Sequence, residues 1–249
     1  MMKNRIIPTV LTDGASQVKG TGFNNWRTVG HVLTAVRVHS ARDVDELMLL
    51  DVTATQQGRV IDRGLVAQVS EELRIPLTVG GGVASVEDFS ALLAAGADKI
   101  VIGTAAVENP PLISALAAEF GNQAIVCSID TVNDSRDSIF VKSGTSLHVI
   151  DPVELASRLE RSGAGELLVQ SVSRDGKMRG MAIELFSAIS QSVKIPVIGS
   201  SGAASAQDFA EALNTGCSAV ACGALFQFTE TTPNRVKSHL KDLGFPVRR

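Results

Sequence analysis

The fold is decided by residues 75–107, IPLTVGGGVASVEDFSALLAAGADKIVIGTAAV, because the chain repeats this stretch at residues 195–226 as IPVIGSSGAASAQDFAEALNTGCSAVACGALF. The two copies are shifted by 120 positions and share the pairs Gly82 and Gly202, Asp88 and Asp208, and Gly103 and Gly223. The same shift extends upstream to Glu46 and Glu166. The repeated unit is therefore far longer than a solenoid repeat. Two such units nearly fill the 249 residues.

Short β-rich runs recur along the chain, and helical patterns such as Ser85 to Leu93, with Ser85 as N-cap and Gly96 as the stop, lie between them. The runs are Ile6 to Leu11, Leu47 to Val52, Leu77 to Val79, Lys99 to Ile102, Ala124 to Asp130, Leu167 to Val172, Pro196 to Ile198, and Ala219 to Cys222. Parallel strands joined by helical crossovers form either a closed barrel or an open sheet. The half-chain duplication favours closure, so we predict an α/β fold, a (β/α)8 TIM barrel formed by duplication of a half-barrel. With no linker-like stretch, residues 1–249 are expected to form one domain.

Composition excludes several classes of function. The formal net charge is −3, which offers no general attraction for nucleic acid or an acidic membrane. Cys127, Cys217 and Cys222 lie in apolar runs without metal-ligand spacing, so we expect buried thiols and neither a metal nor a cofactor. No apolar stretch reaches about 18 residues and no signal peptide precedes the first run, which favours a soluble, cytoplasmic protein.

Glycine-rich turns end two equivalent strands. Gly80-Gly81-Gly82 and its mate Ser200-Ser201-Gly202 can let backbone N–H groups approach an anion, and Gly103-Thr104 and Gly223-Ala224 can complete each site. We call these sets the first and the second cradle. A lone turn of this kind is usually only a turn, but two cradles on opposite sides of one barrel mouth suit a ligand with a phosphate at each end.

Acidic residues gather at the same face. Asp130 ends the fifth run, where an acid is more often catalytic than structural. Asp51 and Asp175 are the other carboxylates near that face, and Asp175 beside Gly176 is as consistent with a turn as with chemistry. The glycine-rich segment from Ala15 to Gly30 is expected to be a long mobile loop over the mouth. The four histidines, which show no pairing, are expected at the surface or in loops: His31, His39, His148 and His239.

Four charges of alternating sign stand at strand starts: Arg5, Glu46, Lys99 and Glu166. They could simply be solvated. If they point into the barrel they must pair, because an isolated buried charge costs several kcal/mol, and a ring of two cations and two anions avoids this cost. Such a ring would plug the barrel floor.

Several segments together carry a resemblance to a known family: Arg5-Ile6-Ile7-Pro8, Val18-Lys19-Gly20, Asp45-Glu46-Leu47, Thr78-Val79-Gly80-Gly81-Gly82, Gly96-Ala97-Asp98-Lys99, Thr104 to Pro110, and Arg174-Asp175-Gly176. Along nearly its whole length the chain resembles the cyclase subunit of imidazole glycerol phosphate synthase. The resemblance implies a doubly phosphorylated ribulosyl substrate and a glutaminase partner docked under the barrel, whose ammonia passes a charged gate. It also implies imidazole glycerol phosphate and an aminoimidazole carboxamide ribotide as products.

The resemblance assigns roles to individual positions. The four strand-start charges map onto the ammonia gate and Asp98 onto a partner contact. The substrate and phosphate contacts are Lys19, Asp51, Gly81, Gly82, Gly103, Thr104, Asp175, Gly176, Ser201, Gly202, Gly223 and Ala224. Two aspartates act as general acid and base in the family, and Asp130 occupies the position on the fifth strand. The first-strand position is Leu11.

Leu11 is the main departure, because loss of one positioned acid–base group costs about 10²- to 10⁴-fold in rate. Asp13 lies two residues on but stands beside Gly14, which favours a turn. Gly103 replaces a usual asparagine and Ser201 a glycine, and residues 30–44 depart from the usual helix pattern. These departures resemble a diverged branch associated with sugar amidation.

Three hypotheses remain. The chain is an ammonia-using cyclase with Asp130 as its main acid–base group, or a delivery module that keeps the gate and the glutaminase partner while its own chemistry has weakened. The third is the sibling sugar isomerase of histidine biosynthesis, which has a run like Ile102-Gly103-Thr104. The isomerase explains neither the charge ring nor Leu11.

Overall fold

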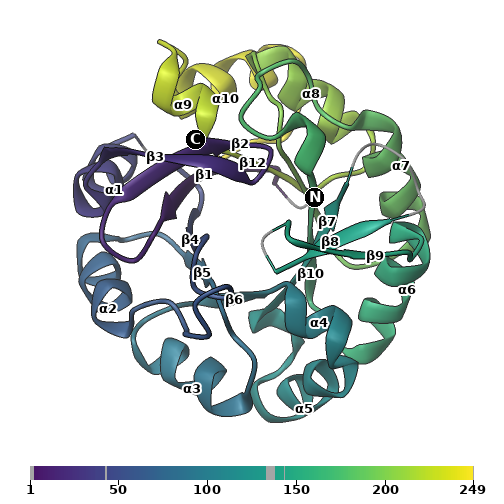
Figure 1. Ribbon diagram of the computed structural model, residues 1–249. Coiled ribbons are helices and arrows are strands. Elements are labelled where there is room, and N and C mark those ends of the chain that lie inside the picture. The colour runs from purple at the N-terminus through teal and green to yellow at the C-terminus, as the bar shows by residue number, and fades with distance from the viewer. Residues whose placement is uncertain (1–2, 43, 133–137, 143, 249) are drawn as a thin grey trace.

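The computed structural model describes residues 3–42, 44–132, 138–142 and 144–248. In this part of the chain, eight parallel strands form a ring enclosed by helices (Figure 1). The strands are, in order around the ring, β1 (Arg5–Thr12), β4 (Leu47–Asp51), β5 (Leu77–Gly80), β6 (Lys99–Ile102), β7 (Ile125–Thr131), β10 (Glu166–Ser171), β11 (Val197–Ser200) and β12 (Ala219–Cys222). The pairing of β12 with β1 and of β7 with β10 closes the ring, which confirms the predicted (β/α)8 barrel.

Helices follow the strands on the outside of the ring: α1 (Val32–Ser40), α2 (Arg63–Glu72), α3 (Val86–Ala94), α4 (Thr104–Glu108), α5 (Pro110–Phe120), η1 (Asn122–Ala124), α6 (Pro152–Ser162), η2 (Val172–Arg174), α7 (Ile183–Ser192), α8 (Ala206–Asn214), α9 (Ala224–Phe228) and α10 (Pro233–Asp242). The two copies of the repeat begin their helices alike. The Ser85 hydroxyl accepts the N–H of Asp88 at 3.1 Å, and Ser205 and Asp208 form a capping box. None of the described helices is long and apolar enough to cross a membrane.

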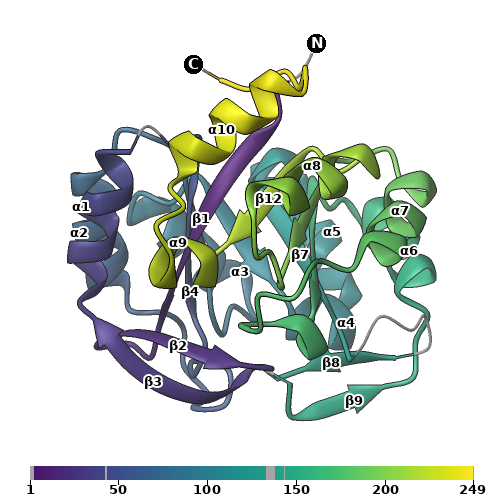
Figure 2. The same cartoon turned by 90° about the horizontal axis from the view of Figure 1, so that it is seen from above.

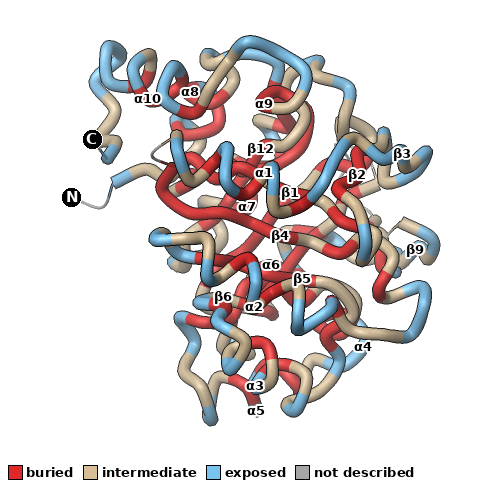
Figure 3. The backbone as a smooth tube through the Cα atoms, turned by 90° about the vertical axis from the view of Figure 1, so that its left-hand side faces the viewer, coloured by how far each residue is buried: buried red, intermediate tan, exposed pale blue. Residues whose placement is uncertain are grey.

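Buried residues follow the barrel strands and parts of the surrounding helices (Figure 3). The apolar core has two parts. The larger part lies between strands and helices and contains the fully buried Phe89 and Phe209, which are equivalent in the repeat. The smaller part fills the inside of the barrel with Ile7, Met48, Val101, Val126, Leu168, Ile198, Ala219 and Ala221. We call this smaller cluster the interior layer. Most of its members lie inside their strands, although Ala219 begins β12, and the layer separates the charges that begin β1, β6 and β10 from the strand ends.

The segment from Ala15 to Gly30 is a hairpin, and its prediction as an irregular loop was wrong. β2 (Gln17–Thr21) extends β1 antiparallel and pairs with β3 (Asn24–Gly30). Gly22 and Phe23, with φ of 62° and 57°, make the turn. Five of the seven β3 residues are exposed, so the strand lacks the apolar alternation by which sequence reveals strands.

A second hairpin, β8 (Ile139–Val141) and β9 (Ser146–His148), extends β7. Both hairpins lie at the end of the barrel opposite the two termini (Figure 2). They approach each other: a side chain added at Gly144 would contact Phe23 at 3.3 Å. The ends of the parallel strands are therefore partly roofed by two turns.

Candidate active site

A cavity of about 630 Å³ opens at the carboxyl ends of the barrel strands, beneath the two hairpins. It receives side chains from both halves of the chain. The residues that sequence analysis assigned to catalysis and substrate binding all line it: Leu11, Lys19, Asp51, Gly81, Gly82, Gly103, Thr104, Asp130, Asp175, Gly176, Ser201, Gly202, Gly223 and Ala224. The fold thus brings residues more than 200 positions apart in the sequence to one site.

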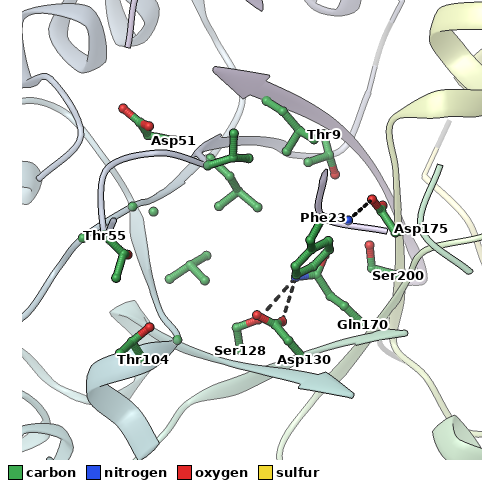
Figure 4. A pocket seen from close by; sticks show the side chains of 18 of the residues that line it. Thr9, Phe23, Asp51, Thr55, Thr104, Ser128, Asp130, Gln170, Asp175 and Ser200 are labelled. Atoms are coloured by element: carbon green, nitrogen blue, oxygen red, sulfur yellow. Dashed lines mark hydrogen bonds between the residues drawn. The ribbon is translucent and has the colours of Figure 1, made fainter. Parts of the chain in front are cut away.

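Asp130 stands near the middle of this cavity, at the end of β7. Figure 4 shows Asp51 and Thr104 on one side and Asp175 and Ser200 on the other, with Asp130 between them. Oδ1 of Asp130 accepts the Ser128 hydroxyl at 2.6 Å and Nε2 of Gln170 at 2.9 Å. Burial raises the pKa of Asp130, and these two hydrogen bonds act in the opposite direction. The carboxyl group is therefore held by neutral donors, and no cation of the described residues forms an ion pair with it.

Near the end of β1 the cavity wall is apolar. Leu11 pairs in register with Leu50 of β4, and both line the cavity. Asp13 offers no substitute acid, because its Oδ1 accepts the N–H groups of Ala15 and Ser16 at 3.0 and 2.8 Å and closes the turn after β1. Its prediction as a turn residue is confirmed.

Asp51 is buried in a local network. It accepts a two-pronged ion pair from Arg59, with NH1 to Oδ2 at 2.6 Å and NH2 to Oδ1 at 3.2 Å, and its Oδ1 also accepts the N–H of Thr53 and of Ala54. Sequence analysis missed Arg59. The signal was available, because a buried carboxylate at a strand end requires a cationic partner.

The first cradle turns sharply at the end of β5. Gly81 and Gly82 have φ of 136° and 71°, and a side chain at Gly82 would collide with the carbonyl of Arg59. Gly103 precedes α4, and a side chain there would meet only Ser128 at 3.7 Å. The glycines therefore keep backbone N–H groups close to the cavity wall.

The second cradle differs at one position. Ser201 holds a φ of 78°, a conformation that favours glycine, and Gly202 follows with a φ of 91°. Among the described residues, the buried Ser201 hydroxyl has no hydrogen-bond partner. The second cradle thus combines backbone strain at Ser201 with a buried hydroxyl from which a bound anion could accept a hydrogen bond.

Lys19 reaches the second cradle from β2. Its Nζ donates to the carbonyl of Thr9 at 3.0 Å and lies against Gly223. Burial lowers the pKa of Lys19 to about 8. No carboxylate of the described residues is within ion-pair distance, although Asp175 is near enough to favour the charged form. A buried ammonium group facing a cradle is a complement for an anion.

Asp175 anchors the roof of the cavity. Its Oδ2 accepts the N–H of Phe23 at 3.4 Å, and its carbonyl accepts the N–H of Gly22 at 3.1 Å. Burial raises the pKa of Asp175 to about 6. The Phe23 ring projects into the cavity from this turn (Figure 4). Sequence analysis missed Phe23 because it read the hairpin as a loop.

The four strand-start charges meet inside the opposite end of the barrel, and we call them the floor ring. NH1 of Arg5 donates to Glu46 at 2.7 Å and NH2 to Glu166, while Nζ of Lys99 donates to both carboxylates at 3.0 Å. Glu46 also accepts the Thr78 hydroxyl at 2.6 Å. Burial favours the neutral acid, but Arg5 and Lys99 outweigh it and lower the pKa of Glu46. The four charges of the floor ring are therefore paired with one another rather than solvated.

Three other predictions from the sequence concern Asp98, the cysteines and His39. Asp98 is exposed beside the floor ring, and its Oδ2 accepts the N–H of Leu77 at 2.8 Å. Cys127, Cys217 and Cys222 are buried and free, as predicted. His39 is not a surface residue: it packs against Phe226, and burial lowers its pKa to about 4. No cluster of metal-ligating side chains occurs in the described ranges.

Comparison with known proteins relates the whole chain to one group. Residues 5–232 match the family model described as "Histidine biosynthesis protein". The chain is 42% identical over 248 residues to the "Putative imidazole glycerol phosphate synthase subunit hisF2" of Campylobacter jejuni, covering 100% of this chain and 99% of that one. It is 41% identical over 250 residues to the "Imidazole glycerol phosphate synthase subunit HisF" of Dictyoglomus thermophilum, with 100% and 99% covered. The same-named subunit of Hyphomonas neptunium is 43% identical over 251 residues, with the same coverage.

Proposed function

The chain belongs to the histidine biosynthesis protein family, among the cyclase subunits of imidazole glycerol phosphate synthase, and from this premise we propose that it is an ammonia-using cyclase and lyase. Its substrate is a ribulosyl aminoimidazole compound with a phosphate at each end. Its products are imidazole glycerol phosphate and an aminoimidazole carboxamide ribotide. The observation that carries this proposal is the position of Asp130 between two anion cradles in one cavity of about 630 Å³.

The two cradles hold the phosphates of this substrate. The first cradle supplies backbone N–H groups of Gly81 and Gly82, and Arg59 neutralises Asp51 beside it, so that no free carboxylate repels the anion. The second cradle adds the Lys19 ammonium group and the unpartnered Ser201 hydroxyl. Two fixed phosphates orient the intervening carbonyl toward Asp130.

Ammonia reaches the cavity from the floor. A glutaminase subunit docks at that end, where Asp98 is exposed, and the floor ring admits ammonia to the barrel interior. The interior layer is apolar, so an ammonium ion would have to lose its hydration at a cost of several kcal/mol, whereas neutral ammonia crosses more easily. The nucleophile therefore arrives uncharged and ready to attack a carbonyl carbon.

Asp130 transfers the protons of the reaction. When ammonia adds to the substrate carbonyl, its nitrogen gains positive charge, and a carboxylate within hydrogen-bond reach accepts a proton. The same group, once protonated, donates that proton to the oxygen that leaves. Burial favours the protonated acid and the Ser128 and Gln170 donors favour the carboxylate, so Asp130 is suited to both roles.

A second candidate function is favoured by one observation, the apolar wall of Leu11 and Leu50. In this alternative the chain is a diverged paralogue that retains the floor and the glutaminase partner but channels ammonia to a sugar amidotransferase. Its own cyclase activity is weak or absent. The two candidates share every feature of the floor and differ only at the mouth.

Single turnover of the bisphosphorylated ribulosyl substrate in excess ammonium salt distinguishes the two. Turnover by the natural protein supports the cyclase, and Leu11→Asp should then raise the rate further, by up to about 10²-fold. No turnover by the natural protein, with activity gained in Leu11→Asp, supports the delivery module. Leu50→Asp is the matched control, because it places an acid on the neighbouring strand in the same layer. Isomerisation without a nitrogen source would contradict both.

A further inference from the structure

The carboxyl group of Asp130 is held asymmetrically. Both of its hydrogen bonds end on Oδ1: the Ser128 hydroxyl at 2.6 Å and Nε2 of Gln170 at 2.9 Å. No donor among the described residues reaches Oδ2. Because the residue lines the cavity, Oδ2 is the oxygen left for a ligand by these hydrogen bonds.

Gln170 reaches Asp130 through the register of two strands. The Cα atoms of Gln170 in β10 and Asp130 in β7 are direct partners in the parallel ladder, so their side chains leave neighbouring strands at the same level. Ser128 lies two residues before Asp130 on β7 and therefore on the same face. Nε2 of Gln170 also lies 3.4 Å from the Ser128 hydroxyl, which closes a three-membered network (Figure 4).

We propose that Gln170 is a positioning residue for Asp130: with Ser128 it holds Oδ1, so that Oδ2 is the single atom that exchanges protons with the ligand. This inference rests on the proposed function and deepens it. The network fixes both the rotation of the carboxyl group and the oxygen that is left free. Fixed geometry of this kind reduces the reorganisation that proton transfer would otherwise require.

Other charges near Asp130 do not perform this task. Asp175 carries a charge that interacts with Asp130 through space, and Lys19 lies beyond it at the second cradle. On the neighbouring strands β6 and β10, the ionisable residues are Lys99 and Glu166, which belong to the floor ring at the opposite end. β8 carries none. Within the described part of the chain, the two neutral donors are therefore the direct contacts of the Asp130 carboxyl group.

The test is a ¹³C NMR titration of aspartate-labelled protein, in which Asp130→Asn identifies the Asp130 carboxyl signal. Gln170→Met removes the amide at similar size, and we expect the titration of Asp130 to move to higher pH, because a donor to the charged form is lost. Ser128→Ala should move it in the same direction. In the double variant, the shift of the Asp130 titration should differ from the sum of the two single-variant shifts, since the three groups form one network.

Thr131→Val is the matched control. The Thr131 hydroxyl donates to the backbone carbonyl of Gln170 at 3.0 Å, so this variant removes a hydrogen bond from the Gln170 backbone and leaves the side-chain amide in place. The Asp130 signal should then stay in place. An unchanged titration in both Gln170→Met and Ser128→Ala would overturn the proposal, as would an equal shift in Thr131→Val. If Gln170→Met does not fold, Ser128→Ala and Gln170→Leu carry the same test.

A kinetic measurement separates this inference from the proposed function. In a protein that turns over, Gln170→Met should lower kcat about tenfold with little change in KM, and the acidic limb of the pH–rate profile should move to higher pH. A titration shift without turnover in the natural protein would refute the cyclase and leave the positioning of Asp130 intact. Turnover without any titration shift would refute the positioning alone.

Discussion

The two ends of the barrel use buried charge in opposite ways. At the floor, Arg5, Lys99, Glu46 and Glu166 satisfy one another in a closed ring. At the mouth, the partner that the described residues offer Lys19 is a carbonyl group, and those they offer Asp130 are neutral donors. A buried charge is therefore compensated within the fold where its partner is built in, and it provides a binding or reactive group where the partner is left to a ligand.

Removal of the reactive group at the mouth should change activity the most. Asp130→Asn should lower the cyclase rate by about 10²- to 10⁴-fold, because the amide cannot accept or donate the transferred proton. The free energy of unfolding should not fall, since burial already disfavours the charged carboxylate. Stopped-assay turnover and denaturant unfolding measure the two quantities. Normal turnover would refute the acid–base role.

A substitution in the floor ring should have the next largest effect, on the free energy of unfolding. Lys99→Ala leaves Arg5 as the one cation of the floor ring to compensate the carboxylates of Glu46 and Glu166. We therefore expect the free energy of unfolding to fall by about 3–5 kcal/mol. Arg37→Ala is the control, because its ion pair with Glu72 is at the surface, with 62% of the Arg37 side chain exposed, and its loss should change the free energy of unfolding far less. Urea unfolding of both variants checks the difference.

The same variant tests the conduit. Lys99→Ala should reduce glutamine-dependent activity more than activity with ammonium salt, because only the first requires passage through the floor ring. Equal loss in both assays would contradict the conduit.

A smaller effect follows from the buried Lys19 ammonium group at the mouth. Lys19 titrates near pH 8 in the free protein because burial lowers its pKa, and a phosphate dianion favours its charged form. Affinity for a bisphosphate ligand should therefore be highest below pH 8 and fall by about tenfold per pH unit above it. Isothermal titration calorimetry from pH 7 to 10 measures this. Lys19→Met should bind more weakly and lose the dependence; a natural protein with pH-independent binding would contradict the assignment.

The smallest effect concerns strain in the second cradle. Ser201→Gly should raise the free energy of unfolding by about 1 kcal/mol, since glycine adopts the observed φ of 78° without penalty. The same change should weaken phosphate binding, because it removes the unpartnered hydroxyl. Gly202→Ala is the control and should destabilise, since its side chain would meet the carbonyl of Gly180. Tighter phosphate binding by Ser201→Gly would show that the hydroxyl is no ligand.

The barrel and most of the mouth could be predicted because the duplication marks equivalent strand ends. Residues 75–107 and 195–226 reveal both cradles, and alternating signs at strand starts reveal the floor ring. Gln170 could not be found this way, because its contact depends on the register between β7 and β10, which local sequence does not encode. His39 could have been placed correctly, since it falls on the helical face of Val32 and Val36, both buried.

The interior layer has a consequence for how this sequence can change. Arg5 begins β1 and Leu11 lies near its end, which separates the floor ring from the mouth by roughly 20 Å of strand. Substitutions that far apart, with no shared partner, contribute nearly additively to the free energy of unfolding. One end can therefore accumulate changes such as Leu11 while the other keeps its full set of ion pairs. The floor and the mouth can therefore change in sequence independently of each other. This division runs along the barrel axis, whereas the two sequence repeats lie side by side around that axis.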